Sequence, residues 1–335
     1  TRDKRNFCIK KLTPFWPIHC NRSNYSNNQP RVSKILFNLI KNGEKMNILI
    51  TGSRGMVGKE LITLLSKNKR NKIIEFDYAL GDDILNEKKL RKKMKGVEII
   101  IHLAGVINDS SNQLWEVNVN GTKKVLQEAI KAKAKKIVFL SSTGVYGITS
   151  GVTSEKTVLN PKTIYEKSKA RAEEIILKEE NKIEVNIIRS AIILGANDYW
   201  KKMFNLLKKK YPLPLNGKNT FQIIYSKELA RIIELVIKKG KKGEIYLAAG
   251  QEKKSLNEFC SLVQKELGIE NNLTHIPLGV GLIFGKLFKI KLLTKENVHH
   301  LAKERNYNIS KIKKLGWKQK YSLKEAVQKI ASEFN

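Results

Sequence analysis

The chain has 335 residues, of which 41% are hydrophobic, and a formal net charge of +33. This length can bury one large core, or one core with a smaller companion, so a short disulfide-stapled scaffold is excluded. The three cysteines, at positions 8, 20 and 260, form no CxxC pair. Their spacing argues against a zinc site or a disulfide framework and favours a reducing, cytoplasmic compartment.

No membrane span is expected. The longest apolar stretch, residues 276–288, is too short to cross a bilayer and is interrupted by glycines, so we expect a buried or interfacial helix there. The first 30 residues lack an apolar core followed by a small-residue cleavage site, and no secretion signal is predicted.

The positive charge would suit a nucleic-acid binder. The lysines, however, are spread over nearly every predicted helix and form no stripe with aromatic residues, and Asn and Ile are abundant too, as expected from AT-rich codons. We therefore expect no specific nucleic-acid partner, with weak, salt-sensitive polyanion binding as the alternative. The charge would also suit an anionic small-molecule substrate.

Residues 1–45 differ from the rest of the chain, because they are rich in Asn, contain prolines and show no sustained period. They are expected to be mostly disordered, with one short helix at 33–40.

From Met46 onward, short apolar runs alternate with helical patterns. In chain order they predict strands at 47–51, 72–77, 97–103, 137–141 and 185–189, and helices at 56–67, 87–95, 112–133 and 165–180. Strands this apolar, separated by helices, indicate a parallel sheet covered on both faces. Right-handed crossovers then give an α/β, doubly wound (Rossmann) fold.

After residue 190 the pattern is mostly helical, with helices at 199–210, 226–239 and 255–267 and short strands at 221–225 and 244–248. We expect a nucleotide-binding domain at 46–190 and a smaller, mostly helical substrate region at 191–335, part of which returns to the sheet.

A glycine turn, TGSRGMVG, lies between the first strand and the first helix. The first glycine permits a tight turn, the second lets the backbone approach a pyrophosphate, and the third allows close helix packing. The phosphates would lie at the helix N-terminus, among unpaired N–H groups. The turn residues predicted to bind the cofactor are Gly52, Arg54, Gly55, Met56, Val57 and Gly58.

Asp77 ends the next predicted strand, 19 residues after Gly58. A carboxylate there can accept hydrogen bonds from a ribose 2′-OH and would repel a 2′-phosphate, so NAD is favoured over NADP. Arg54 and Arg70 keep NADP as the alternative, and a solvated strand-end carboxylate is the structural alternative for Asp77.

A second motif, YEKSK, places Tyr165 and Lys169 one helical turn apart, on the same face. A nearby ammonium lowers the pKa of a phenol, so Tyr165 is a candidate general base for an alcohol or acid for a ketone. Ser142 or Thr143, in LSSTGVYG, would orient the substrate oxygen. For so short a pattern, a surface Tyr/Lys pair is the ordinary alternative.

Together these motifs resemble those of the extended short-chain dehydrogenase/reductase family, in its NAD-dependent epimerase/dehydratase branch. The resemblance runs from Met46 almost to the C-terminus. The matching segments are TGSRGMVG (TGxxGxxG), HLAG at 102–105, NVNGT at 118–122, SSTGVYG at 141–147 (SSxxVYG), YEKSK (YxxSK) and LGWKQKYSLKEAV at 315–327 (LGWxPxxSLxEG).

The resemblance implies NAD as cofactor, a small-molecule substrate and a catalytic set of Ser142, Tyr165 and Lys169, with Thr143 as the runner-up for the serine. Lys169 would tune Tyr165 and touch the nicotinamide ribose. No metal is expected, and a homodimer is compatible with the motifs. The remaining residues implied to contact the cofactor are Asp83 and Ile84 at the adenine, and Leu103, Ala104 and Gly105. Packing is expected to hold His102, and Asn118 is expected to be structural.

Departures from the family motifs bear on the substrate. The Asp-Glu pair that follows the catalytic hydroxyl in 4,6-dehydratases is replaced by Thr143 and Gly144, so water elimination is disfavoured. Nucleotide-sugar epimerases often carry an asparagine three residues after a strand arginine, where Ile192 stands here. They also often carry an Arg-Asp pair where this chain has Thr220-Phe221.

The first hypothesis is therefore an NAD-dependent enzyme that acts on a nucleotide-linked sugar by transient or net hydride transfer. The alternatives are a dehydrogenase or reductase of an apolar alcohol, similar to 3β-hydroxysteroid dehydrogenases, and a non-catalytic NAD-binding protein. Relatives begin a few residues before the first strand, and residues 43–45 fit a purine-rich ribosome-binding site read as protein. We expect residues 1–45 to lie outside the working enzyme.

Overall fold

The computed structural model describes residues 45–334, except 215, 271, 278 and 281–303. The disorder and the helix expected before residue 45 lie outside the described residues, as does most of the apolar stretch 276–288. Within the part of the chain that the structure describes, no helix is long and apolar enough to cross a membrane.

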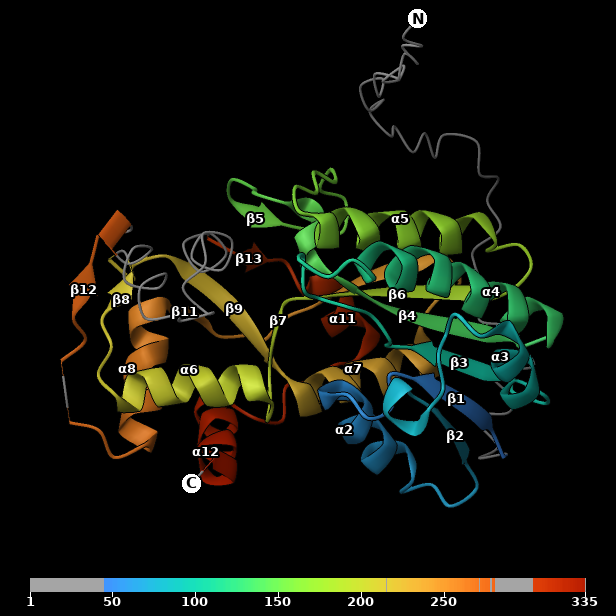
Figure 1. The fold of residues 1–335 in the computed structure, drawn as a ribbon, viewed down its shortest axis with the longest axis horizontal. Helices are drawn as coiled ribbons and strands as arrows, with labels where there is room; N and C mark the ends of the chain where they lie inside the picture. The colour runs from blue at the N-terminus through green and yellow to red at the C-terminus, as the bar shows by residue number, and fades with distance from the viewer. Residues whose placement is uncertain (1–44, 215, 271, 278, 281–303, 335) are drawn as a thin grey trace, which may run out of the picture. The chain divides into compact units, whose positions relative to one another are not determined.

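A parallel sheet of six strands forms the centre, in the order β10-β6-β4-β3-β1-β2 (Figure 1). The strand order reverses between β1 and β3, and in open α/β sheets ligands bind at the carboxyl ends of the strands beside such a reversal. The doubly wound fold class is confirmed. The strands are β1 (Asn47–Thr51), β2 (Lys72–Phe76), β3 (Ile99–His102), β4 (Lys136–Ser142), β6 (Glu184–Ser190) and β10 (Glu244–Ala248).

Alternate residues of each strand enter different cores, because successive side chains point to opposite faces of a sheet. In β1, Ile48 and Ile50 pack in the cluster that contains α2 (Met56–Leu65) and α7 (Ser226–Lys239). Leu49, between them, packs in the second cluster. That cluster contains residues of α3 (Glu87–Lys93), α4 (Thr122–Lys131) and α5 (Ile164–Lys178). Helices therefore cover both faces, as the apolar strands predict (Figure 1).

The predicted helix at 112–133 is interrupted. A π-helical turn, Glu116–Gly121, precedes α4. Within it, the Asn118 side chain hydrogen-bonds the backbone N–H and carbonyl of Val106, each at 2.8 Å. It also donates to the hydroxyl of Ser168 at 3.0 Å. These bonds hold the Asn118 amide against Val106 and Ser168, which accounts for the wider π-helical turn at this position. Short π-helical turns within α-helices are common at functional sites.

Beyond residue 190 the chain adds a third core around β9 (Thr220–Tyr225). It packs α6 (Asp198–Lys208), α8 (Leu256–Glu266) and α12 (Leu323–Phe334). The strand β10 and the helix α7, by contrast, belong to the central sheet and its cover. The smaller elements are η1 (Tyr78–Leu80), η3 (Thr143–Tyr146), β5 (Val152–Thr153), β7 (Ile192–Leu194), β8 (Leu213–Pro214), β11 (Lys253–Ser255), β12 (His275–Ile276), β13 (Asn306–Tyr307) and α11 (Ser310–Leu315).

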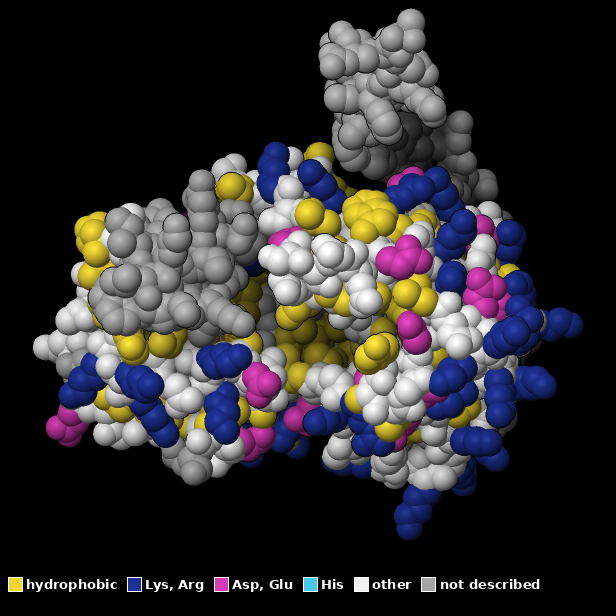
Figure 2. All heavy atoms as spheres, viewed as in Figure 1, with side chains coloured by type: hydrophobic (Ala, Val, Ile, Leu, Met, Phe, Trp, Pro, Cys, Tyr) yellow, Lys and Arg dark blue, Asp and Glu magenta, His cyan; other side chains and the backbone are white. Residues whose placement is uncertain are grey.

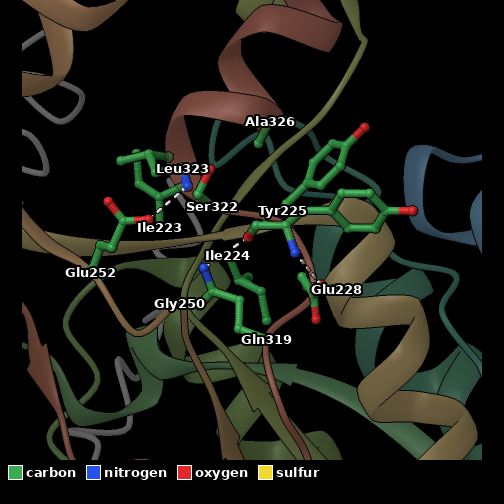
Figure 3. Close-up of a pocket in the computed structure, with 11 residues that line it drawn as sticks. Ile223, Ile224, Tyr225, Glu228, Gly250, Glu252, Gln319, Ser322, Leu323 and Ala326 are labelled. Carbon is green, nitrogen blue, oxygen red and sulfur yellow. Dashed lines mark hydrogen bonds between the residues drawn. The ribbon is translucent and has the colours of Figure 1, made fainter.

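A buried carboxylate in the first turn of α7 fixes the closing segment 315–327. Glu228 Oε1 accepts hydrogen bonds from the N–H groups of Lys320 and Tyr321 at 2.7 and 2.9 Å. Its Oε2 accepts one from the Trp317 indole at 3.0 Å. Figure 3 shows Glu228 and Glu252 directed at this backbone from opposite sides of a small pocket. None of the predicted catalytic residues lines that pocket. The pocket therefore lies where α12 packs against the rest of the chain.

Candidate active site

The glycine turn brings three strand ends into contact. Gly52 has a φ of +70°, and its N–H donates to the carbonyl of Phe76 at 2.9 Å. A Cβ at Gly52 would lie 2.8 Å from the backbone nitrogen of Ala104, and one at Gly58 would lie 2.4 Å from the carbonyl oxygen of Gly52. No side chain fits at either position, because both approaches are to backbone atoms.

The turn fits an anionic group. The helix α2 begins directly after Gly55, with neither a side-chain cap nor an acidic residue in its first turn, so its first N–H groups and its dipole face the turn. Ser53 adds a buried hydroxyl that has no hydrogen-bond partner among the residues that the structure describes. Met56 lies against Gly195, and Val57 is buried, so these two would reach a pyrophosphate through their backbone.

Asp77 lies at the end of β2, beside the turn. Its Oδ2 accepts a hydrogen bond of 2.8 Å from the N–H of Arg54, and its Oδ1 accepts one of 2.9 Å from Ala79. Each carboxylate oxygen has a second lone pair available for a ribose hydroxyl. The Arg54 guanidinium is held by Glu75 at 3.0 Å, which leaves it less available to a 2′-phosphate.

The other predicted cofactor residues line the same edge. Ala104 donates to the Thr51 hydroxyl at 3.3 Å, next to Leu103. Gly105 is close enough to Asn118 and Lys169 that its Cβ would lie 3.1 and 4.0 Å from their side-chain atoms. Asp83 caps a turn by accepting from the N–H of Leu85 at 2.8 Å. Ile84 is buried and lies directly against Gly121.

His102 is the last residue of β3 and is fully buried. Its two ring nitrogens lie 2.7 and 2.9 Å from the hydroxyls of Thr51 and Thr122. Burial, with a smaller effect of the Lys169 charge, lowers the pKa of His102 to about 3. The ring is therefore neutral at physiological pH and serves as a hydrogen-bonded core residue.

The predicted catalytic hydroxyls meet at the carboxyl edge of the sheet. Ser142 is the last residue of β4, and Tyr165 lies in the first turn of α5. The phenol of Tyr165 is close enough to the Ser142 side chain for the serine to lower the pKa of the phenol. The α5 helix starts here because Thr163 and Glu166 form a capping box, which orients its first turn.

The electrostatics differ from the expectation for a Tyr/Lys pair. Burial raises the pKa of Tyr165 to about 12, while the nearby Ser142 side chain opposes this and the charges of Asp109 and Glu166 add to it. Lys169 Nζ donates to the carbonyl of Leu140 at 2.6 Å and lies 4.2 Å from the centre of the Phe139 ring. The predicted lowering of the Tyr165 pKa is therefore absent in this state, because desolvation of the phenol dominates.

Lys169 itself is strongly perturbed. Burial lowers its pKa to about 7, with the charge of Glu173 opposing the shift. An ammonium has three donors, so the bond to Leu140 leaves two donors for other groups. A buried amine whose pKa is strongly shifted is typical of functional sites.

The structure adds residues that the motifs do not reveal. The buried Thr143 side chain lies near the phenol of Tyr307 in β13, and both Arg305 and Thr143 lower the pKa of this phenol against the larger effect of burial. Gln222 fixes Tyr307 by accepting from its N–H at 2.6 Å. These residues are far from the catalytic motifs in the sequence, and no periodicity signals the contact.

The strand arginine, Arg189, makes its polar contacts inside the protein. It contacts both carboxylate oxygens of Glu173, the closest at 2.6 Å, and donates to the hydroxyl of Tyr146 at 2.7 Å. Pairing with Glu173 and Tyr146 raises the pKa of Arg189 against the effect of burial. The guanidinium is satisfied within the protein.

The comparisons with known proteins agree with this geometry. The model of the NAD dependent epimerase/dehydratase family matches residues 48–249. A putative UDP-glucose 4-epimerase of Methanocaldococcus jannaschii is 27% identical over 85% of this chain and 97% of its own length.

An N-acetyl-alpha-D-glucosaminyl-diphospho-ditrans,octacis-undecaprenol 4-epimerase of Escherichia coli O157:H7 is 26% identical over 73% of this chain and 79% of its own length. Among solved structures, the dTDP-glucose 4,6-dehydratase DesIV of Streptomyces venezuelae, with NAD bound, superposes with a TM-score of 0.72. That match has 22% identity over 86% of this chain and 96% of DesIV, and it supports the fold. The chain belongs to the NAD dependent epimerase/dehydratase family, which confirms the predicted cofactor, NAD.

Proposed function

We propose that the chain is an epimerase that acts on a nucleotide-linked sugar by transient hydride transfer. The observation that carries the proposal is the position of Ser142, at the end of β4, beside Tyr165, in the first turn of α5, at the sheet edge that also holds the glycine turn. The similarity to UDP-glucose and lipid-diphosphate-sugar 4-epimerases supports the reaction class.

The roles follow from the positions of the side chains. Tyr165 would take the proton from the substrate hydroxyl, and Ser142 would hold the same oxygen by a hydrogen bond. NAD, when bound at the glycine turn, supplies the acceptor and then the donor of a hydride. Burial keeps Tyr165 protonated in the free chain, so its proton transfer depends on positive charge in the filled site, to which the Lys169 ammonium contributes.

Dehydration is disfavoured by the surroundings of Ser142. Thr143 and Gly144 carry no acid, and the nearest carboxylate to Gly144 is that of Glu166. Glu166 is buried and accepts hydrogen bonds from the N–H groups of Lys162 and Thr163 at 2.7 and 3.1 Å. A carboxylate used in this way to cap a helix is a poor acid for expelling water.

A dehydrogenase or reductase of an apolar alcohol is the second candidate. The observation that favours it is the internal pairing of Arg189 with Glu173 and Tyr146, together with the absence of the family's diphosphate-binding residues at Ile192 and Thr220-Phe221. The same Ser142–Tyr165 chemistry would then end with release of NADH and not with its reoxidation.

The two candidates predict different products. The purified chain is incubated with NAD and a panel of UDP-, GDP- and dTDP-sugars and apolar secondary alcohols, with NADH absorbance and sugar stereochemistry as readouts. Epimerised sugar without net NADH supports the epimerase, and net NADH with an apolar alcohol supports the second candidate. Turnover that survives Tyr165→Phe would contradict both.

A further inference from the structure

Aliphatic side chains are exposed on the segments around the candidate active site, namely the loops, the strand β5 and the first turn of α5. The exposed fractions are 76% for Ile107, 60% for Ile148, 67% for Val152, 81% for Val158 and 52% for Ile164. A single exposed aliphatic residue is ordinary, but a group of them on neighbouring loops marks an interaction surface. These five residues are called the apolar rim below.

The segments that carry the apolar rim touch one another. Tyr165, which follows Ile164, donates its N–H to Asp109, two residues after Ile107, at 2.6 Å. Asn160 donates to the carbonyl of Val145 at 3.0 Å. A Cβ on Gly147, which precedes Ile148, would lie 2.1 Å from the carbonyl oxygen of Asn160.

The same loops give the rim a bias to positive charge. Their carboxylates are used inward: Asp109 binds the N–H of Tyr165, Glu166 caps α5, and Glu155 accepts from the N–H of Leu247 at 3.0 Å. Lysines on these segments remain exposed, namely Lys156, Lys162 and Lys167. In Figure 2, hydrophobic and basic side chains stand beside each other near the start of α5.

We infer that the apolar rim docks on the surface of an anionic lipid bilayer, with the aliphatic side chains among the headgroups and the lysines at the level of the lipid phosphates. Aliphatic residues next to exposed lysines are the combination that binds such interfaces. A second copy of the chain fits less well, because an isologous contact would bring the lysines of both copies together. The inference goes beyond the proposed function and does not depend on which alcohol reacts.

The test is flotation of the full chain with vesicles of phosphatidylcholine and phosphatidylglycerol, compared with vesicles of phosphatidylcholine alone. Val158→Asp and Ile148→Asp are expected to weaken binding to the anionic vesicles by about tenfold, since a charge replaces an inserted aliphatic group. Leu80→Asp is the matched control, because Leu80 is 45% exposed but lies in η1, after β2.

A second pair of variants tests how much the exposed lysines contribute to binding of the anionic vesicles. Lys162→Glu is expected to weaken binding, whereas Lys69→Glu, an identical change at an exposed position between α2 and β2, at the amino edge of the sheet, should leave it unchanged. Thermal unfolding and NAD affinity of every variant exclude misfolding as the cause of a loss.

Three results would overturn the inference. The first is that the chain does not bind anionic vesicles. The second is that the rim and control variants lose binding equally. The third is that, without lipid, the wild-type chain is a dimer and Val158→Asp is a monomer. The last result would assign the rim to contact between copies.

Discussion

The carboxylate of Asp109 accepts a hydrogen bond of 2.6 Å from the backbone N–H of Tyr165. This bond joins the loop after β3 to the first turn of α5, where the candidate catalytic phenol lies. The same loop is held at Val106 by Asn118, which also reaches Ser168 in α5. Tyr165 is therefore positioned from outside its own helix.

Removing the Asp109 acceptor is expected to impair turnover. Asp109→Ala leaves the N–H of Tyr165 without this partner, and loss of about 1 kcal/mol of positioning corresponds to roughly a fivefold to tenfold fall in kcat. Asp109→Asn retains an acceptor oxygen and should keep most of the activity. Steady-state kinetics on the accepted substrate measures both, and equal losses in the two variants would show that the charge and not the hydrogen bond matters.

Lys169→Met is expected to stabilise the fold while it abolishes activity. The pKa of Lys169 is lowered to about 7 from an unfolded value near 10.4, so burying the amine costs free energy below pH 10. The cost is greatest at and below pH 7 and shrinks as the pH rises toward 10, where the unfolded state also loses its proton.

Urea unfolding of both proteins at pH 7 and pH 9.5 measures this difference. The variant should gain on the order of 3 kcal/mol at pH 7 and much less at pH 9.5. A gain that is the same at both pH values would show that the amine is not desolvated as the structure indicates. Lys162→Met, at an exposed position, is the control and should show no such pH dependence.

The central sheet could be predicted from the sequence because its strands are nearly continuous apolar runs separated by helices, which indicates parallel strands joined by right-handed crossovers. The glycine turn was equally predictable, because Gly52 and Gly58 face backbone atoms. The π-helical turn at Glu116–Gly121 was not, since it depends on where the Asn118 amide finds its partners. The spacing of Tyr165 and Lys169 predicted a shared face but not the depth of burial, which reverses the expected pKa shift of the tyrosine.

The contact between Thr143 and Tyr307 could not be predicted from the motifs either. It depends on how β13 pairs with β5 and on the Gln222 side chain that holds Tyr307. The role of Arg189 was equally hidden, because a strand arginine pairs with whichever carboxylate the neighbouring helix presents, and here Glu173 of α5 presents it.

Gly58→Ala is expected to weaken NAD binding and stability together. The added Cβ would lie 2.4 Å from the Gly52 carbonyl oxygen and 2.5 Å from that of Ser53, so the helix α2 must move away from the turn that fits the pyrophosphate. Titration calorimetry with NAD should show at least about a tenfold weaker affinity, consistent with loss of one charge-assisted hydrogen bond or more. Gly96→Ala is the control for lost stability alone: Gly96 has a φ of +69° and open space around its Cβ position, so alanine strains the backbone there and should lower stability without changing NAD affinity. Unchanged affinity in Gly58→Ala would place the cofactor elsewhere.

Breaking the buried ion pair is expected to destabilise the fold, and it also removes the Glu173 charge that opposes the lowering of the Lys169 pKa. Glu173→Gln leaves the buried Arg189 charge without its partner, and such changes cost about 3 to 5 kcal/mol. Chemical denaturation measures the loss. The double variant Glu173→Gln/Arg189→Met removes the unpaired charge and should be more stable than Glu173→Gln alone; if it is less stable, the pair stabilises through packing and not through charge.

Analysis of the sugar products formed with NAD tests the central claim most directly. The wild-type chain, loaded with NAD and offered UDP-, GDP- and dTDP-sugars, is predicted to invert one carbinol carbon of a sugar with no net NADH. Tyr165→Phe is predicted to lower the rate by about 10² or more while it binds NAD normally. Inversion that persists in Tyr165→Phe, or a wild-type chain that binds NAD but inverts no sugar in the panel, would contradict the account.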